Sequence, residues 1–167
     1  MKNIVRSVIV AAMLSALLTV SKLALSFVPN VELVSFLIVI YSLTQGRRVY
    51  AIVAVFVATE CMIYPFGLWS INYIYIWFIL VLAVRLLRRF DSALLFAAVS
   101  GAFGLLFGAL CSVMYVFIPS FGPSFAFSYF VSGIWFDVAH GVGNFVICLV
   151  LYRPIMTMFK KLKKYYA

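Results

Sequence analysis

The sequence predicts an all-α membrane protein that forms a single domain over residues 1–167. Two observations lead to this class. The chain is 67% hydrophobic and 10% charged, with a mean hydropathy of +1.20, whereas soluble domains carry about 25% charged residues. Apolar stretches long enough to cross a bilayer also recur along the chain. At this length the chain has no room for a soluble catalytic domain beside its membrane part.

Six apolar stretches are expected to be transmembrane helices, because about 20 apolar residues cross a bilayer. Polar residues, glycines and prolines separate them, at "VPN", "QGRR", "YPFG", "RLLRR", "IPSFGPS" and Pro154. The predicted spans are about 5–28, 33–43, 49–64, 71–87, 93–117 and 136–152. The second span is short, so we expect it to be tilted or shielded by its neighbours.

The basic residues orient these six spans. An even number of spans puts both termini on one side, and twelve of the thirteen lysines and arginines map to that side. They are Lys2, Arg6, Arg47, Arg48, Arg85, Arg88, Arg89, Arg153, Lys160, Lys161, Lys163 and Lys164. The positive-inside rule makes this side cytoplasmic. The net charge of +9 therefore reflects topology and contact with the lipid bilayer rather than binding to nucleic acid, and the tail "MFKKLKKYY" is expected to rest on the inner leaflet.

The N-terminal stretch also fits a second interpretation. Its basic start, its apolar middle and Ala24-Leu25-Ser26 match the pattern of a cleaved secretion signal. Cleavage there would leave an odd number of spans, so we expect the stretch to be retained as the first helix.

A polar face interrupts the last predicted span. Asp137, His140, Gly141 and Asn144 are spaced i, i+3, i+4 and i+7, which places them on one side of a helix. His140 and Asn144 lie deep in the span, where an unpartnered polar group costs several kcal/mol. They form either the wall of a ligand pocket or interhelical hydrogen bonds. Asp137, which follows the turn-like "SGIWF", is either a pocket residue or the N-cap of this helix.

Charged residues also occur near the same outer ends of other spans. Glu32 follows the first span, Lys22 lies about two turns below its outer end, and Glu60 lies about one turn below the outer end of the third. Ionisable groups within a membrane are costly unless they are paired or face water. Lys22 and Glu60 therefore form either a structural ion pair or part of a ligand site.

Aromatic residues are concentrated on this side as well. Trp69, Tyr73 and Trp77 are spaced i, i+4 and i+8 at the start of the fourth span. A second set lies in the predicted loop between the last two spans: Phe121, Phe125, Phe127, Tyr129, Phe130 and Trp135. These rings belong either to an aromatic belt at the headgroups or to a lid over a flat organic ligand. Polar groups surrounded by rings are typical of a ligand pocket, here one that opens outward.

Catalytic and metal sites are not expected. His140 is the only histidine, so the three-ligand set of a catalytic zinc is absent, and no glycine-rich nucleotide loop occurs. Cys61, Cys111 and Cys148 lie in apolar runs and are expected to be buried thiols. The sequence therefore predicts a protein that is not an enzyme and that carries no catalytic residue, metal or cofactor.

Small residues recur at four-residue spacing in two spans. Ala12 and Ala16 lie in the first, and Gly104 and Gly108 lie in the fifth. Such spacing lets helix backbones approach closely in lipid. We expect the fifth-span pair to serve internal packing, and the first-span pair to serve either internal packing or contact with another membrane protein.

These features together resemble the substrate-binding S components of energy-coupling factor (ECF) vitamin transporters. The resemblance covers essentially the whole chain and rests on the six spans, the pair Ala12-x-x-x-Ala16 and three longer stretches. Those stretches are "VPNVELVSFLIVIY", "GLWSINYIYIW" and "SGIWFDVAHGVGNFV". The longer stretches are more specific than the alanine pair.

The resemblance implies a function in the bacterial cell membrane. The protein would bind a water-soluble vitamin or related micronutrient from outside for ATP-driven import, with a transmembrane T component and two cytoplasmic ATPase subunits as partners. Ala12 and Ala16 would dock on the T component. The gate loop would contain Pro29, Asn30 and Glu32.

The substrate-binding candidates come from the helical-face argument. They are Asp137, His140, Asn144, Glu60, Trp69, Asn72 and Tyr73. The Pro-Asn-Val loop and the pattern Phe-Asp-x-x-His-x-x-x-Asn resemble those of cobalamin-type S components, so the resemblance implies a cobalamin-like substrate. The nickel and cobalt members of the family carry an N-terminal histidine motif, and its absence here disfavours a metal substrate. The acidic outer lining favours a neutral or cationic ligand over a polyanion.

Two other functions fit parts of the pattern. A structural or assembly protein of the cell envelope would have six spans and no small-molecule ligand. A small membrane enzyme or channel would need Asp137 or His140 for its chemistry.

Overall fold

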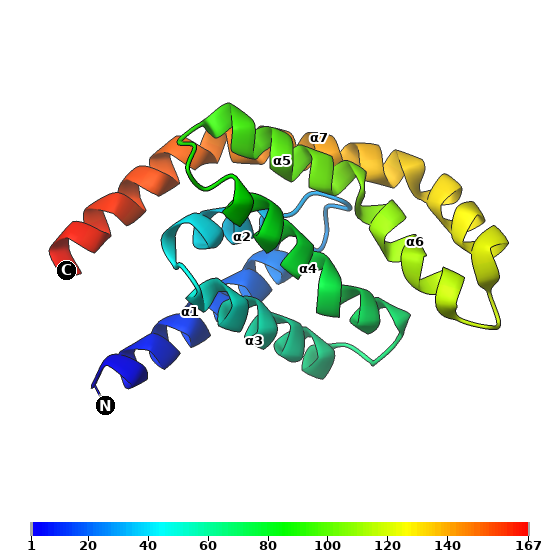
Figure 1. The fold of residues 1–167 in the computed structure, drawn as a ribbon, viewed down its shortest axis with the longest axis horizontal. Helices are drawn as coiled ribbons and strands as arrows, with labels where there is room; N and C mark the ends of the chain where they lie inside the picture. The colour runs from blue at the N-terminus through cyan, green and yellow to red at the C-terminus, as the bar shows by residue number, and fades with distance from the viewer. Residues whose placement is uncertain (1, 167) are drawn as a thin grey trace.

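The computed structural model describes the backbone of residues 2–166 and the side chains of residues 4–162. Over this range the chain folds into seven helices and no strand (Figure 1). The helices are α1 (Lys2–Ala24), α2 (Val34–Thr44), α3 (Arg48–Ile63), α4 (Leu68–Leu86), α5 (Ala93–Leu105), α6 (Phe107–Phe117) and α7 (Gly122–Tyr166). The predicted all-α class is therefore confirmed for the described residues.

Three helices are long and apolar enough to cross a membrane. They comprise Ile4–Ala24 in α1, Leu68–Leu86 in α4 and Gly122–Leu162 in α7. Helices α5 and α6 meet at a 41° bend and make a fourth candidate if they are counted as one broken span. Helices α2 and α3, with 11 and 16 residues, are shorter than the roughly 20 residues of a typical span.

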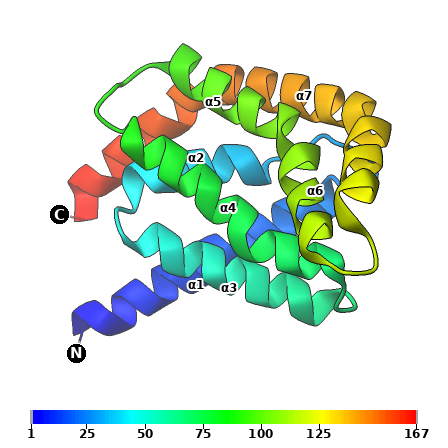
Figure 2. The same cartoon turned by 45° about the vertical axis from the view of Figure 1, so that its right-hand side comes forward.

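The second helix is shielded by its neighbours, which is one of the two arrangements expected from its short length. Eight of its eleven residues are buried: Val34, Ser35, Phe36, Ile38, Val39, Ile40, Tyr41 and Ser42. Figure 2 shows α2 between α4 and α7. An apolar helix that is covered on nearly all sides is stabilised by packing rather than by contact with lipid.

Helix α7 differs from the prediction at both ends. It begins at Gly122, so most of the residues expected to form a loop before the last span are helical. Pro123 suits the first turn of a helix, and a continuous helix satisfies the backbone hydrogen bonds of an apolar segment. Asp137 therefore lies within the helix, and the interpretation of this residue as an N-cap is wrong.

The other end of α7 continues beyond the predicted boundary. Pro154 lies inside the helix instead of terminating it. A proline within a helix removes one hydrogen bond and bends the axis, and Figure 1 shows α7 changing direction along its length. Its 41-residue apolar part is roughly 60 Å long, about twice the thickness of the hydrocarbon core.

Glycines bring α5 against α7. A Cβ atom added at Gly104 would lie 2.8 Å from Gly141 Cα, and one added at Gly101 would lie 3.2 Å from the Gly141 carbonyl oxygen. Only residues without a side chain allow backbones to approach this closely. The expectation that small residues of the fifth span serve internal packing is confirmed.

The first residues of α1 and the last residues of α7 lie at the same end of the helical bundle (Figure 2). The α2–α3 and α4–α5 connections lie there too, and Arg85 Nη1 donates a 2.5 Å hydrogen bond to the Gly46 carbonyl. Most of the basic residues predicted to be cytoplasmic lie in these segments, and we call this end of the bundle the basic end. The side chains of Lys2, Lys163 and Lys164 lie outside the described residues.

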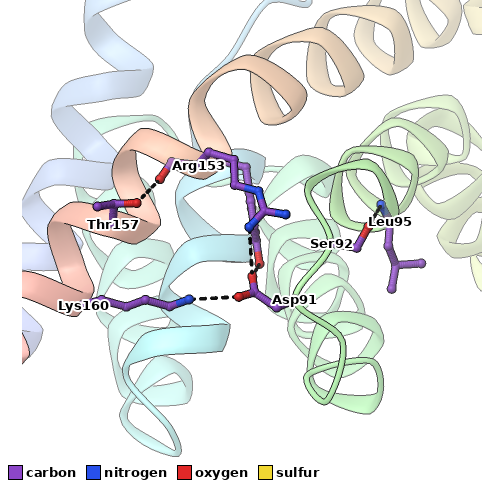
Figure 3. A network of polar contacts seen from close by, with 7 residues as sticks. Asp91, Ser92, Leu95, Arg153, Thr157 and Lys160 are labelled. Atoms are coloured by element: carbon purple, nitrogen blue, oxygen red, sulfur yellow. Dashed lines mark hydrogen bonds and ion pairs between the residues drawn. The ribbon is translucent and has the colours of Figure 1, made fainter.

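An acidic residue links the α4–α5 connection to α7 at this basic end (Figure 3). Lys160 Nζ donates a 2.9 Å hydrogen bond to Asp91 Oδ2, and Arg153 Nη1 lies 3.9 Å from Asp91 Oδ1. The Lys160 hydrogen bond lowers the pKa of Asp91 below its usual value. The Asp91 side chain is 54% exposed, so solvent screens the interaction.

We expect Asp91→Asn to lower the free energy of unfolding at pH 7 by less than about 1 kcal/mol. Because the pKa of Asp91 is lowered in the folded state, its contribution is present above the unfolded pKa of about 3.9 and is lost as the pH falls through the folded pKa. Thermal unfolding of the wild type and Asp91→Asn at pH 7 and at pH 3 measures this difference. A difference that grows at pH 3 would contradict the pKa direction.

Candidate functional site

A cavity of about 570 Å³ lies at the connection between α3 and α4, and Lys22 from α1 contributes to it. Its lining residues are Lys22, Tyr64, Pro65, Trp69 and Tyr73. The basic end of the bundle contains the start of α3, whereas the cavity lies beyond the last turn of α3. Figure 2 shows the α3–α4 connection at the opposite end of the bundle from this basic end, and the cavity lies beside that connection.

Local structure of the α3–α4 connection positions the cavity wall. Tyr64 ends α3 in an extended conformation, which suits a residue that precedes proline. Ser70 Oγ then accepts a 3.2 Å hydrogen bond from Gly67 N and caps the start of α4. Trp69 Nε1 donates a 3.0 Å hydrogen bond to the Pro65 carbonyl. These bonds fix the indole of Trp69 against the connection.

Three aromatic contacts run from the cavity into the core. The ring centroids of Tyr64 and Trp69 are 6.1 Å apart, those of Trp69 and Tyr73 are 5.4 Å apart, and those of Tyr73 and Trp77 are 5.4 Å apart. Each pair is nearly perpendicular, an arrangement that aromatic quadrupoles favour. Trp77 is 1% exposed. Trp69, Tyr73 and Trp77, spaced i, i+4 and i+8, thus contact one another in a row along α4, and Tyr73 connects the cavity to the core.

Lys22 and Glu60 form an ion pair beside these rings, as one of the two interpretations predicted. The Lys22 side chain is 28% exposed, whereas that of Glu60 is 0% exposed. The ammonium also lies 4.7 Å from the Tyr64 ring centroid and 5.0 Å from that of Tyr73, within the range of cation–π attraction. Lys22 therefore faces the cavity, and the carboxylate of Glu60 lies behind it.

Asp137, His140 and Asn144 of α7 face the interior together, as their spacing predicted. Asp137 and His140 are each 7% exposed, and Asn144 is 0% exposed. Asp137 Oδ1 accepts a 2.9 Å hydrogen bond from Gly108 N in α6. His140 Nε2 lies 2.9 Å from Glu32 Oε1. Asp137 and His140 thus have interhelical or loop partners, and none of the three residues lines the cavity.

Glu32 connects the predicted gate loop to the rest of the bundle. Ser35 Oγ, at the start of α2, donates to the same Glu32 oxygen that contacts His140. Nearby, Asn30 adopts a left-handed conformation with φ of 59°, which asparagine tolerates better than most residues. Pro29 lies in the same segment and is exposed. Glu32 therefore links the segment between α1 and α2 both to α2 and to α7.

The remaining site candidates are distributed as follows. Asn72 is buried in α4 and accepts a 3.0 Å hydrogen bond from the Tyr75 hydroxyl, so it does not line the cavity. The aromatic side chains of Phe121, Phe125 and Tyr129 cluster around Tyr115 of α6. Phe127 and Trp135 of the same set are instead 68% and 82% exposed, and no member of the set lines the cavity.

Two lining residues, Tyr64 and Pro65, were not among the sequence-predicted site residues. Lys22 was predicted to form either an ion pair with Glu60 or part of a ligand site, and the structure places it in both. The break "YPFG" at the end of the third span was the available signal, because a proline that follows an aromatic residue there forces the chain to turn. In the sequence, this break indicated only the boundary between the third and fourth predicted spans. No group of three or more His, Cys, Asp or Glu side chains suited to a metal occurs in the part of the chain that the structure describes.

Asn144 is buried without a hydrogen-bond partner for either amide atom among the described residues. We expect Asn144→Leu to raise the free energy of unfolding by about 1–2 kcal/mol, because it removes an unsatisfied buried amide and keeps the volume similar. Thermal unfolding of the purified protein measures the change.

Asn72→Leu is the matched control for this prediction. Asn72 is also buried but accepts the Tyr75 hydrogen bond, so its replacement should lower stability. A loss of stability in Asn144→Leu as well would show that water or a ligand satisfies the amide of Asn144.

Comparison with protein-family models, with curated proteins and with solved structures gives no match for this chain. The class that the fold defines is an all-helical protein with three or four candidate membrane spans.

Proposed function

We propose that the protein is the S component of an ECF-type transporter, which binds a micronutrient outside the bacterial cell membrane and delivers it for ATP-driven import. The observation that carries the proposal is the ring-lined cavity with one lysine at the end of the bundle opposite the basic residues. A concave site with a few polar groups among aromatic rings is the usual form of a small-molecule site.

The proposed topology has six spans, formed by α1, α2, α3, α4, the bent pair α5–α6, and α7. Under the positive-inside rule the basic end is cytoplasmic, so both termini are inside and the cavity opens outward. The burial of α2 supports its place as a short span shielded by the other helices.

The size of the cavity bears on the substrate. Its volume of about 570 Å³ lies within the range of about 300–1,000 Å³ for small-molecule pockets. A corrinoid with its nucleotide loop is much larger than this space. We therefore propose a micronutrient of one or two rings in place of the cobalamin-like substrate that the sequence pattern favoured. The roles of Asp137, His140 and Asn144 as substrate contacts remain predictions.

The exposed face of α1 supports a docking role. Ala12 and Ala16 are both exposed, and the neighbouring Met13 and Val20 are 67% and 58% exposed. A face of small residues that no other described helix covers allows a partner helix to approach closely in lipid. We assign this face to the T component.

We expect Ala12→Leu and Ala16→Leu to reduce uptake to background while ligand binding stays unchanged, because a bulky side chain separates the two docking helices. Co-purification with a co-expressed T component and ATPases measures docking, and native mass spectrometry measures the retained ligand. Ala54→Leu is the control, since Ala54 is an exposed alanine on α3. Full uptake by the α1 variants would refute the docking role, and an absence of both ligand and partners would favour the ligand-free envelope function.

A further inference from the structure

The ammonium of Lys22 has hydrogen-bonding capacity to offer to a ligand. A lysine ammonium has three N–H donors, and among the described residues Glu60 is its only hydrogen-bond acceptor. Its other recorded contacts are with the ring faces of Tyr64 and Tyr73. Since Lys22 lines the cavity, an acceptor atom on a bound molecule can accept a hydrogen bond from one of the remaining N–H groups.

The charge balance around Lys22 selects against charged ligands. Lys22 and Glu60 together are neutral, so an anionic ligand would leave a second negative charge beside a carboxylate that is 0% exposed. Glu60 Oε1 is already buried without a hydrogen-bond partner in the described chain, and further negative charge would raise that cost. A cationic ligand would meet the ammonium of Lys22 directly, because Glu60 does not line the cavity.

The aromatic walls define the shape of the ligand. The planes of Trp69 and Tyr73 meet at 88°, so a flat ring can stack on one of them and present its face to the edge of the other. The ring plane of Tyr64 lies at 86° to that of Trp69. A cavity of about 570 Å³ with this corner suits one ring or two fused rings.

We infer that the cavity takes a neutral, flat compound of one or two fused rings, with a carbonyl oxygen that accepts a hydrogen bond from Lys22 Nζ. The inference rests on the proposed function, because it takes this cavity to be the substrate site. The sequence favoured a neutral or cationic ligand. The structure also disfavours a cationic ligand, because Lys22 lines the cavity and its acidic partner Glu60 does not.

Three probes with the same fused two-ring framework and different charge test the inference. They are 2-quinolone, which is a neutral carbonyl compound, quinoline-2-carboxylate, which is an anion, and N-methylquinolinium, which is a cation. Equilibrium dialysis with the purified protein should show that 2-quinolone binds about ten-fold more tightly than either charged probe. Tighter or equal binding of a charged probe, or no binding of 2-quinolone, would overturn the inference.

Two variants separate the hydrogen bond from the stacking. The double variant Lys22→Met/Glu60→Met removes both charges together, and its affinity for 2-quinolone should fall about ten-fold. Trp69→Ala keeps the ion pair of Lys22 with Glu60 and should lower the affinity for all three probes. An unchanged affinity for 2-quinolone in the double variant would overturn the role of Lys22.

Native mass spectrometry and co-purification, carried out on the same purified protein, test this inference and the proposed function separately. A charged micronutrient retained in native mass spectrometry would overturn the inference and leave the transporter role intact. A failure to assemble with the T component and ATPases would overturn the transporter role, while the order of the three probe affinities would still decide the ligand class.

Discussion

Replacing Gly104 with alanine is expected to lower the free energy of unfolding by about 3 kcal/mol. The new Cβ atom would lie 2.8 Å from Gly141 Cα, Gly141 N and His140 C. All three are backbone atoms, so no side-chain rotation relieves the contact, and α5 has to separate from α7. The loss exceeds the gain of about 0.5–1 kcal/mol that alanine normally brings over glycine in a helix.

Gly133→Ala is the matched control for this substitution. Gly133 also lies within a helix, and no heavy atom lies within 4 Å of a Cβ built there. We expect this variant to be more stable than the wild type by about 0.5–1 kcal/mol. Thermal unfolding of both variants in the same detergent gives the comparison. Equal behaviour of the two variants would mean that α5 and α7 do not approach as closely as described.

The close approach of α5 and α7 also affects the polar residues beside it. The His140 backbone is part of the contact with Gly104, and the His140 side chain contacts Glu32 in the segment between α1 and α2. A shift of α7 in Gly104→Ala should therefore loosen that segment. Limited proteolysis between α1 and α2 measures this effect, and Gly133→Ala should show wild-type resistance.

Replacing Lys22 with methionine is expected to lower the free energy of unfolding by about 3 kcal/mol, because it leaves the carboxylate of Glu60 buried without its partner. Glu60 is 0% exposed, and its second oxygen has no hydrogen-bond partner among the described residues. Glu60→Met should cost less, because the Lys22 side chain is 28% exposed and its ammonium can extend toward water.

The double variant Lys22→Met/Glu60→Met completes a double-mutant cycle with the two single variants. Removing both charges eliminates the unpaired carboxylate, so we expect most of the stability lost in Lys22→Met to return. Thermal unfolding of the wild type, the two single variants and the double variant provides the measurement. A double variant less stable than Lys22→Met would show that the pair contributes to stability beyond charge compensation.

The sequence predicted most accurately those features that depend on neighbouring residues along one helix. The face shared by Asp137, His140 and Asn144 depends only on helical periodicity, and all three side chains are buried as that face requires. The extent of α7 was misjudged because Gly122, Pro123 and the aromatic residues after them resemble a loop in composition. Proline and glycine are tolerated at the first positions of a helix, and composition alone does not distinguish a helix start from a loop.

By itself the sequence determined the all-α class, the presence of helices apolar enough to cross a membrane and the polar face of the last helix, because hydropathy and periodicity act over neighbouring residues. Only the tertiary structure decided that His140 meets Glu32, 108 residues away, and that Lys22 covers the carboxylate of Glu60 beside Tyr64 and Tyr73. These contacts depend on which helices pack together and at what rotation. That choice depends on side-chain packing across the whole bundle.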